Sequence, residues 1–152
     1  MTLGFTYLET PTGTVISGRG PTVEAAFTQV AQGALALAMD PRAVEEVEAR
    51  VVRAHGVEAA DLLVNWLNEC LYVMEVEGFL ARRVEITTAS LKRAEAGGEP
   101  LRLHGLLHGE ELDHVRHASV RTLTGFSRQG ASVRQDDKGY EATAKTCVQS
   151  CK

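Results

Sequence analysis

The stretch LLVNWLNECLYVMEVEGF, residues 62–79, has the periodicity of an amphipathic helix. Gly78 stands where such a helix would end. The only tryptophan of the chain, Trp66, belongs to its apolar residues, so we expect this face to be buried against a sheet. The apolar residues recur at steps of three and four and form one wide face: Leu62, Leu63, Trp66, Leu67, Cys70, Leu71, Val73 and Met74.

The polar side chains of the same stretch raise the question of a functional role. Asn65, Asn68 and Glu69 fall largely outside the apolar face. Buried or half-buried amide groups are normally hydrogen-bonded to neighbouring backbone, so such residues more often anchor a loop than perform catalysis. We therefore interpret them as interaction or anchoring residues.

The residues before this helix predict two short strands and another helix. Residues 4–9 and 14–20 are rich in β-forming residues, and 10–13 has the composition of a turn. Residues 20–40 predict a helix that Thr22 can cap. A strand hairpin followed by a helix is therefore expected at the N-terminal end.

The remaining segments favour strands. Residues 44–56 fit either a helix or an edge strand, and their periodicity does not distinguish the two. Short β-branched or alternating segments then follow at 83–88, 90–96, 101–109, 119–126, 131–135 and 140–148. This order predicts an α+β fold, with two main helices packed on one face of a largely antiparallel sheet.

The composition is that of a single globular domain over residues 1–152. Apolar residues make up 44% and charged residues 24%, which argues against a mostly disordered chain. The net charge of −4 disfavours broad non-specific binding of nucleic acid but is compatible with a local basic patch. No apolar run could span a bilayer and no signal peptide is recognisable, so we expect a cytoplasmic protein without a membrane partner.

The three cysteines are an odd number, which favours reduced thiols over a disulfide framework. Cys70 lies on the apolar face and is expected to be a core residue. Cys147 and Cys151 are four residues apart and lack the C-x-x-C spacing of redox or metal motifs.

The histidines are a candidate zinc site. His104 and His108 are four apart, and His114 and His117 follow in HGEELDHVRH. The surroundings of the first pair predict a strand, on which they would lie about 13 Å apart, too far to share one ion without a bend. The alternative interpretation is that these histidines lie in exposed polar loops.

No self-sufficient catalytic set is apparent. The chain lacks G-x-S-x-G, a Walker loop and G-x-G-x-x-G. Acidic pairs such as Glu110-Glu111 are most simply solvated side chains. An enzyme in its own right is therefore the least favoured class.

LVNWLNECLYVMEVEGF, residues 63–79, resembles the archease signature, which is usually close to LVDWLNELLYLFDTEGL. The preceding GPTVEAAFTQVAQGALALAMD is similar to the archease stretch G-x-T-x-x-E-A-F. VRHASVRTLTGF and the final GYEATAKTCV resemble later archease segments. The resemblance covers nearly the whole chain and implies an SHS2-type α+β fold with a strand at 47–54.

The resemblance also implies a function. Archeases activate the GTP-dependent tRNA-splicing RNA ligase and help to guanylylate its histidine, with a divalent cation, Ca²⁺ or Mg²⁺, held on archease carboxylates. An archease-like accessory protein would have an RNA ligase or another RNA-repair or RNA-processing protein as its partner and would meet RNA indirectly.

Departures from the archease pattern fall on its metal site. Archeases open with E-H-T-A-D, whereas this chain keeps Glu9 but has Thr10 in place of the histidine and Gly13 in place of the aspartate. The terminal aspartate falls on Cys147 or its neighbour, and the aspartate of the helix signature is Asn65. We therefore expect a degenerate metal corner at Glu9, Thr10, Gly13 and Cys147.

The carboxylates that remain are few. The corner would keep at most Glu9 and Glu69, and a hard cation requires charged oxygen ligands. We expect no cofactor and an action by protein docking. Two alternatives stay open: a soft-metal or small-molecule module that uses Cys147, Cys151 and a histidine, and a structural homo-oligomer without ligand.

Overall fold

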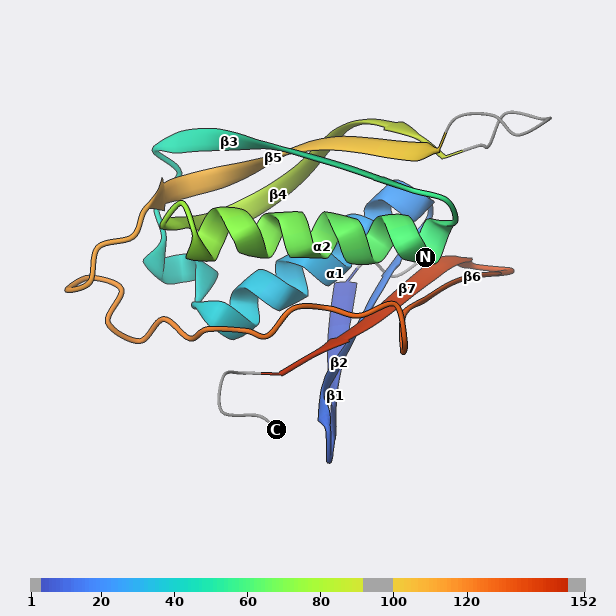
Figure 1. Cartoon of the computed structure of the whole chain (residues 1–152), viewed down its shortest axis with the longest axis horizontal. Coiled ribbons are helices and arrows are strands. Elements are labelled where there is room, and N and C mark those ends of the chain that lie inside the picture. The colour runs from blue at the N-terminus through green and yellow to red at the C-terminus, as the bar shows by residue number, and fades with distance from the viewer. Residues whose placement is uncertain (1–3, 92–99, 148–152) are drawn as a thin grey trace.

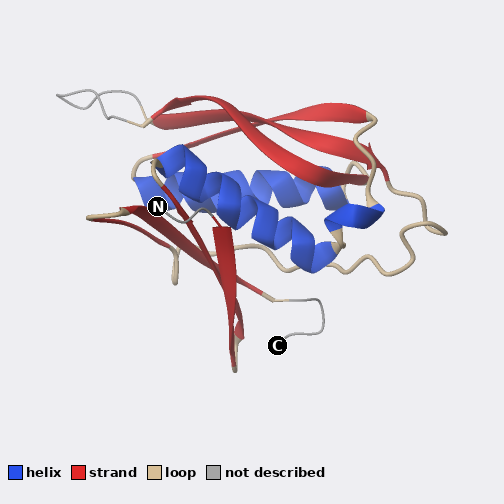
Figure 2. Cartoon of the chain, turned by 180° about the vertical axis from the view of Figure 1, so that it is seen from behind, coloured by secondary structure: helices blue, strands red, loops and turns tan. Residues whose placement is uncertain are grey.

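The computed structural model describes residues 4–91 and 100–147. Two helices lie side by side between two antiparallel sheets (Figure 1 and Figure 2). The helices are α1 (Val23–Ala38) and α2 (Ala59–Glu75), and a short 3-10 turn, η1 (Pro41–Ala43), follows the first. This arrangement gives both helices two buried faces.

The strands divide between the two sheets. The first has the order β1-β2-β7-β6, and the second has the order β3-β5-β4. All described strand pairs are antiparallel. The bounds are β1 Gly4–Thr10, β2 Gly13–Gly20, β3 Glu48–Gly56, β4 Phe79–Ser90, β5 Leu101–Glu111, β6 Ser132–Asp136 and β7 Gly139–Thr146.

The helix starts follow from local side-chain chemistry. The Thr22 hydroxyl accepts a hydrogen bond from the Ala25 N–H at 3.0 Å, which caps α1 as predicted. At the start of α2 the Asp61 carboxylate accepts from the Glu58 N–H at 3.0 Å. No helix among the described residues is both long and apolar enough to cross a bilayer.

The α+β class and the antiparallel pairing are confirmed, with the strands in two sheets rather than one. The ambiguous segment is a strand, β3, as the archease resemblance implies. The strand predicted at 119–126 is wrong, because this segment runs as an extended loop with a single bridge residue at Leu123. The strand predicted at 90–96 falls mostly on residues outside the described ranges.

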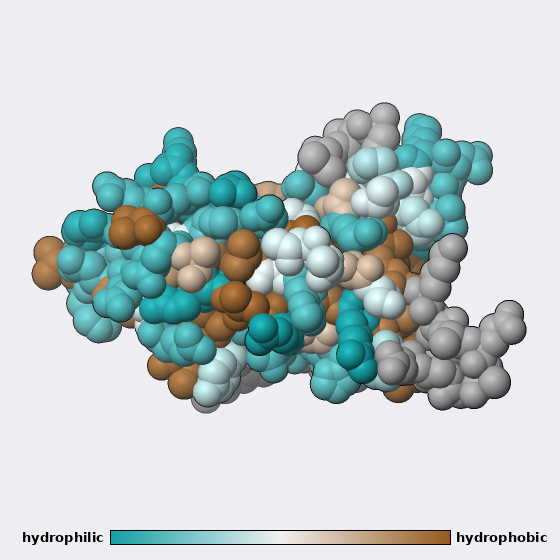
Figure 3. Space-filling model, turned by 90° about the horizontal axis from the view of Figure 1, so that it is seen from above, coloured by the Kyte–Doolittle hydropathy of each residue, from teal (hydrophilic) through white to brown (hydrophobic). Residues whose placement is uncertain are grey.

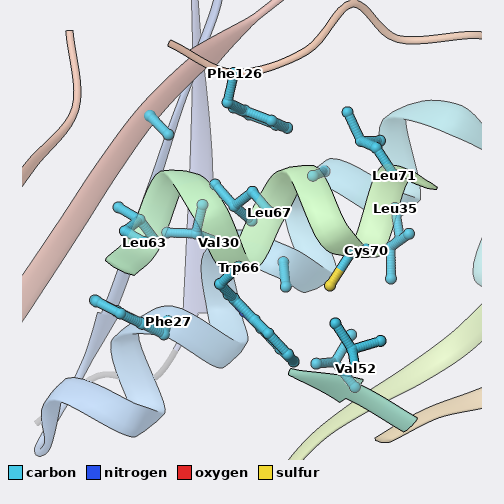
Figure 4. Close-up of a cluster of buried hydrophobic side chains, with 14 of the residues drawn as sticks. Phe27, Val30, Leu35, Val52, Leu63, Trp66, Leu67, Cys70, Leu71 and Phe126 are labelled. Carbon is cyan, nitrogen blue, oxygen red and sulfur yellow. The ribbon is translucent and has the colours of Figure 1, made fainter. Parts of the chain in front are cut away.

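The core is organised around Trp66, whose side chain is fully buried. It extends from α2 toward Val52 on β3, while Phe126 covers the opposite side of the helix (Figure 4). Gly105 on β5 makes room for the indole, because a Cβ at this position would lie 2.5 Å from Trp66 Cη2 and 2.7 Å from the Glu85 carbonyl oxygen. The close approach of α2 to the sheet therefore depends on a glycine at 105.

Gly105→Ala is expected to lower the free energy of unfolding by about 1–3 kcal/mol, because the added methyl group meets both the indole and a backbone carbonyl. Urea unfolding followed by tryptophan fluorescence measures it. The matched control is Gly4→Ala, also in a strand, where a Cβ would meet no atom within 4 Å. Equal stability of the two variants would contradict the packing argument.

Candidate functional site

The predicted metal corner lies at the tip of the β1–β2 hairpin, where the end of β7 reaches it. Glu9 pairs with Thr14 across the hairpin, and Thr14 pairs with Thr146 on β7. Thr10 and Gly13 close the turn opposite each other. Cys147 follows β7 directly, so the structure brings the four predicted corner positions together.

Hydroxyl groups occupy the interior of this corner. Thr14 and Thr146 are both buried. The Thr14 hydroxyl donates to Glu9 Oε1 at 2.8 Å, and the Thr146 hydroxyl donates to the Thr124 carbonyl oxygen at 2.6 Å. The Thr10 hydroxyl donates to the Gly13 carbonyl oxygen at 2.8 Å. The corner thus holds one carboxylate, Glu9, next to several hydroxyl groups, and the Lys145 ammonium donates to the Thr12 hydroxyl in the turn.

The backbone at Gly13 leaves no room for a side chain. Its φ of +147° lies in a region that L-residues rarely adopt. A Cβ there would lie 2.6 Å from the Thr146 carbonyl oxygen and 2.9 Å from Cys147 Sγ. An aspartate at position 13 would therefore require the strand end of β7 to move.

Cys147 lies at the corner beside the hairpin turn. Its Sγ lies 3.0 Å from the Thr12 carbonyl oxygen, and its own carbonyl oxygen accepts from the Thr124 N–H at 2.8 Å. Cys151 lies outside the described residues, and Cys70 is a buried free cysteine whose pKa is raised by desolvation.

The two asparagines of α2 tie distant backbone to the helix. Asn68 Nδ2 donates to the Phe126 carbonyl oxygen at 2.9 Å, and Asn68 Oδ1 accepts from the Phe126 N–H at 2.7 Å. Asn65 Nδ2 donates to the His55 carbonyl oxygen at 2.7 Å. Glu69 is exposed and is not joined to the corner by any contact of the described residues.

A model of the Archease protein family (MTH1598/TM1083) matches residues 5–145. The chain belongs to the archease family. It is 31% identical to Protein archease of Pyrococcus abyssi (strain GE5 / Orsay) over 102 residues, which cover 67% of this chain and 68% of the relative. It is 32% identical to Protein archease of Thermococcus gammatolerans (strain DSM 15229 / JCM 11827 / EJ3), over 102 residues and with the same two shares.

The fold agrees with a solved structure. The solution structure of Methanobacterium thermoautotrophicum protein 1598 superposes with a TM-score of 0.74 at 18% sequence identity. The match covers 95% of this chain and 98% of that chain. Membership in the archease family therefore rests on the sequence matches, and the structural match adds the fold.

The corner residues of this archease do not fit a hard divalent cation. Ca²⁺ takes six to eight oxygen ligands, usually with several carboxylates among them. Glu9 is the one carboxylate at the corner, and a hydroxyl already donates to it. Across residues 4–91 and 100–147, no group of three or more His, Cys, Asp or Glu side chains is placed to hold a metal ion.

Adding about 1 mM CaCl₂ is expected to raise the Tm by less than about 2 °C, because a ligand no tighter than millimolar adds only RT ln 2 to stability. Scanning calorimetry with and without calcium checks this, with Glu9→Gln as the paired variant. A larger calcium-dependent rise that Glu9→Gln abolishes would show that the corner binds the ion.

Among residues 4–91 and 100–147 the histidines belong to no group of side chains placed to hold a metal ion. One of them, His117, belongs to a buried cluster that the sequence did not predict. His108 Nε2 lies 2.9 Å from Glu85 Oε1 on the neighbouring strand. His117 is fully buried, and its Nδ1 accepts from the Asp113 N–H at 2.9 Å. Its Nε2 therefore carries the proton and donates to Glu110 Oε2 at 3.1 Å.

Glu110 is buried, which corrects the interpretation of Glu110-Glu111 as a solvated pair. Burial raises the pKa of its carboxyl group, but hydrogen bonds outweigh this and hold the pKa below its ordinary value. The Glu45 N–H donates at 2.8 Å, and Arg116 and His117 donate as well. The cluster therefore connects the segment that follows β5 to Glu45, which lies just before β3.

The lowered pKa of Glu110 predicts acid destabilisation. The charged carboxylate stabilises the fold fully above its ordinary pKa of 4.5, and this contribution is lost as pH falls through the lower folded-state pKa. The free energy of unfolding of Glu110→Gln, from urea titrations between neutral and acidic pH, should fall less steeply than that of the wild type. The control is Glu111→Gln, whose exposed side chain should leave the wild-type pH dependence unchanged.

Proposed function

We propose that this archease is a non-catalytic accessory protein that activates a GTP-dependent tRNA-splicing or RNA-repair ligase by docking, without a metal ion in its own corner. The observation that carries the proposal is the family match over residues 5–145. It is supported by the four corner positions, among which Glu9 is the one carboxylate and accepts a hydrogen bond from the Thr14 hydroxyl.

The tip of the β1–β2 hairpin is the proposed docking element. The hairpin projects away from the helices (Figure 1) and carries the corner at its end. Tyr7 fastens one face of the hairpin to α1 through a hydrogen bond from its hydroxyl to the Gly33 carbonyl oxygen at 2.6 Å. Leu8 points to the other face and is 64% exposed. An exposed leucine on an edge strand suits a protein partner.

The test is guanylylation of the RNA ligase from the same genome, with and without this protein, in Mg²⁺, Mn²⁺ or Ca²⁺. We expect stimulation by the wild type and by Glu9→Gln alike. Leu8→Asp should reduce the stimulation by about tenfold or more, because it places a charge in the docking surface.

The control variant is Val115→Asp, which adds the same charge at an 86% exposed valine outside the hairpin. It should stimulate the ligase as the wild type does. A ligase whose guanylylation rate is the same with and without the wild-type protein contradicts the accessory role. Equal stimulation by Leu8→Asp and the wild type contradicts the docking site.

A further inference from the structure

A hollow of about 590 Å³ lies beside the corner at the hairpin tip. The β1–β2 turn borders it on one side, and the loop from Thr124 to Gly130 and the end of β7 border it on the others. Its lining includes Thr12 from the turn, Gln129 from the loop and Lys145 from β7. We call this space the corner hollow.

Lys145 is the only charged residue among the described residues that line the corner hollow. Its ammonium group donates to the Thr12 hydroxyl and forms no ion pair within residues 4–91 and 100–147. The chain has 20 acidic residues and a net charge of −4, so carboxylates are not scarce in this molecule. The positive charge at the hollow therefore has a neutral partner, and no described lining residue is acidic.

Two arginines on the sheets show the contrast with Lys145. On the sheet that also contains β7, Arg19 pairs with Asp136 at 2.8 Å. On the outer face of the β3–β5–β4 sheet, which is largely hydrophilic (Figure 3), Arg83 pairs with Glu46 at 3.0 Å. These cations are held by carboxylates of the chain itself, whereas the ammonium group at the hollow can accept an external anion.

The lining of the hollow offers free hydrogen-bond donors. An ammonium group has three N–H donors, and the Thr12 hydroxyl takes one of those of Lys145. Gln129 is engaged only through its backbone carbonyl oxygen within the described chain, so its side-chain amide is available. The Thr124 hydroxyl oxygen already accepts from the Cys147 N–H at 3.0 Å, so this hydroxyl can serve a ligand as a donor. Several donors around one positive charge suit a ligand with several anionic oxygens.

A phosphate monoester has the required chemistry. Its phosphate group carries a charge of about −1.5 to −2 at neutral pH and three strong acceptor oxygens, and lysine binds phosphate as a point charge. The volume of about 590 Å³ lies within the usual range of small-molecule pockets, so the alcohol part of an ester also has room. No aromatic residue is among the described lining residues, so a nucleobase would find no ring to stack on. Hydroxyl and amide groups suit a sugar instead.

We propose that the corner hollow binds the phosphate group of a small phosphorylated sugar, with Lys145 on the phosphate oxygens and Gln129 and Thr124 as further donors. This assigns an anion to the corner where the archease resemblance implies a cation. It goes beyond the proposed docking function and needs no ligase for its test.

The test is isothermal titration calorimetry of ribose 5-phosphate into the full chain at low salt, with inorganic phosphate and ribose titrated for comparison. The variant Lys145→Gln removes the charge and keeps a hydrogen-bonding side chain. Its matched control is Lys138→Gln, which makes the same change at an exposed residue just before β7. The two lysines are seven residues apart along the strand, or about 23 Å.

We expect the wild type to bind ribose 5-phosphate more tightly than inorganic phosphate and not to bind ribose. Lys145→Gln should weaken the binding of ribose 5-phosphate by about tenfold or more, because it removes a charge-assisted hydrogen bond. Lys138→Gln should bind within about twofold of the wild type. Circular dichroism establishes that each variant is folded. Gln129→Leu, which should weaken binding by about threefold, replaces Lys145→Gln if that variant is not folded.

Three results would overturn the proposal. The first is no binding of ribose 5-phosphate by the wild type. The second is an equal loss in Lys145→Gln and Lys138→Gln, which would show a general effect of net charge. The third is binding of inorganic phosphate or of ribose as tight as that of ribose 5-phosphate, which would remove one half of the proposed ligand. Because no ligase is present, these results leave the docking proposal to its own test.

Discussion

The packing of Trp66 over Gly105 is the constraint on which the position of α2 depends. The indole is fully buried, and its Nε1 has no hydrogen-bond partner among the described residues. An unpaired buried N–H costs about 1–3 kcal/mol, so the orientation of the ring is set by its shape and by the absence of a Cβ at 105. A hydrogen bond does not fix it. The tryptophan of the archease signature is therefore a packing residue.

The corner at the hairpin tip depends on this packing through α2. Once the helix is seated, Asn68 binds both backbone groups of Phe126 on the side away from the β3–β5–β4 sheet. That contact holds the extended segment whose Thr124 hydrogen-bonds with Cys147 and accepts from Thr146 at the end of β7. The corner thus consists of the β1–β2 hairpin and of the segment around Thr124, which α2 holds in place through Asn68. Its hydroxyl network belongs to the fold and is not an isolated surface feature.

The predictable parts of the molecule are those with a local signal. The periodicity of the two helices is such a signal, and both helices are present in the structure. The corner positions were predicted from the archease resemblance, and the structure brings them together at the hairpin tip. The error at 119–126 has a long-range cause, because the Asn68 side chain 58 residues away supplies the partners that a neighbouring strand would have given Phe126. The burial of Glu110 also has a cause outside its own strand. Glu110 lies next to the last residue of β5, and the segment that follows folds back and covers it with His117.

The proposed docking hairpin and the β3–β5–β4 sheet lie on opposite sides of the helical layer. The β3–β5–β4 sheet covers one side of α1 and α2, and the β1–β2 hairpin extends from the other (Figure 1). A protein docked at Leu8 would therefore leave the outer face of the β3–β5–β4 sheet open to solvent. Because the helices pack tightly against both sheets, the core fixes the position of the hairpin relative to the second sheet. The exposed face of the hairpin is thus held in one defined orientation relative to the helix that carries the archease signature.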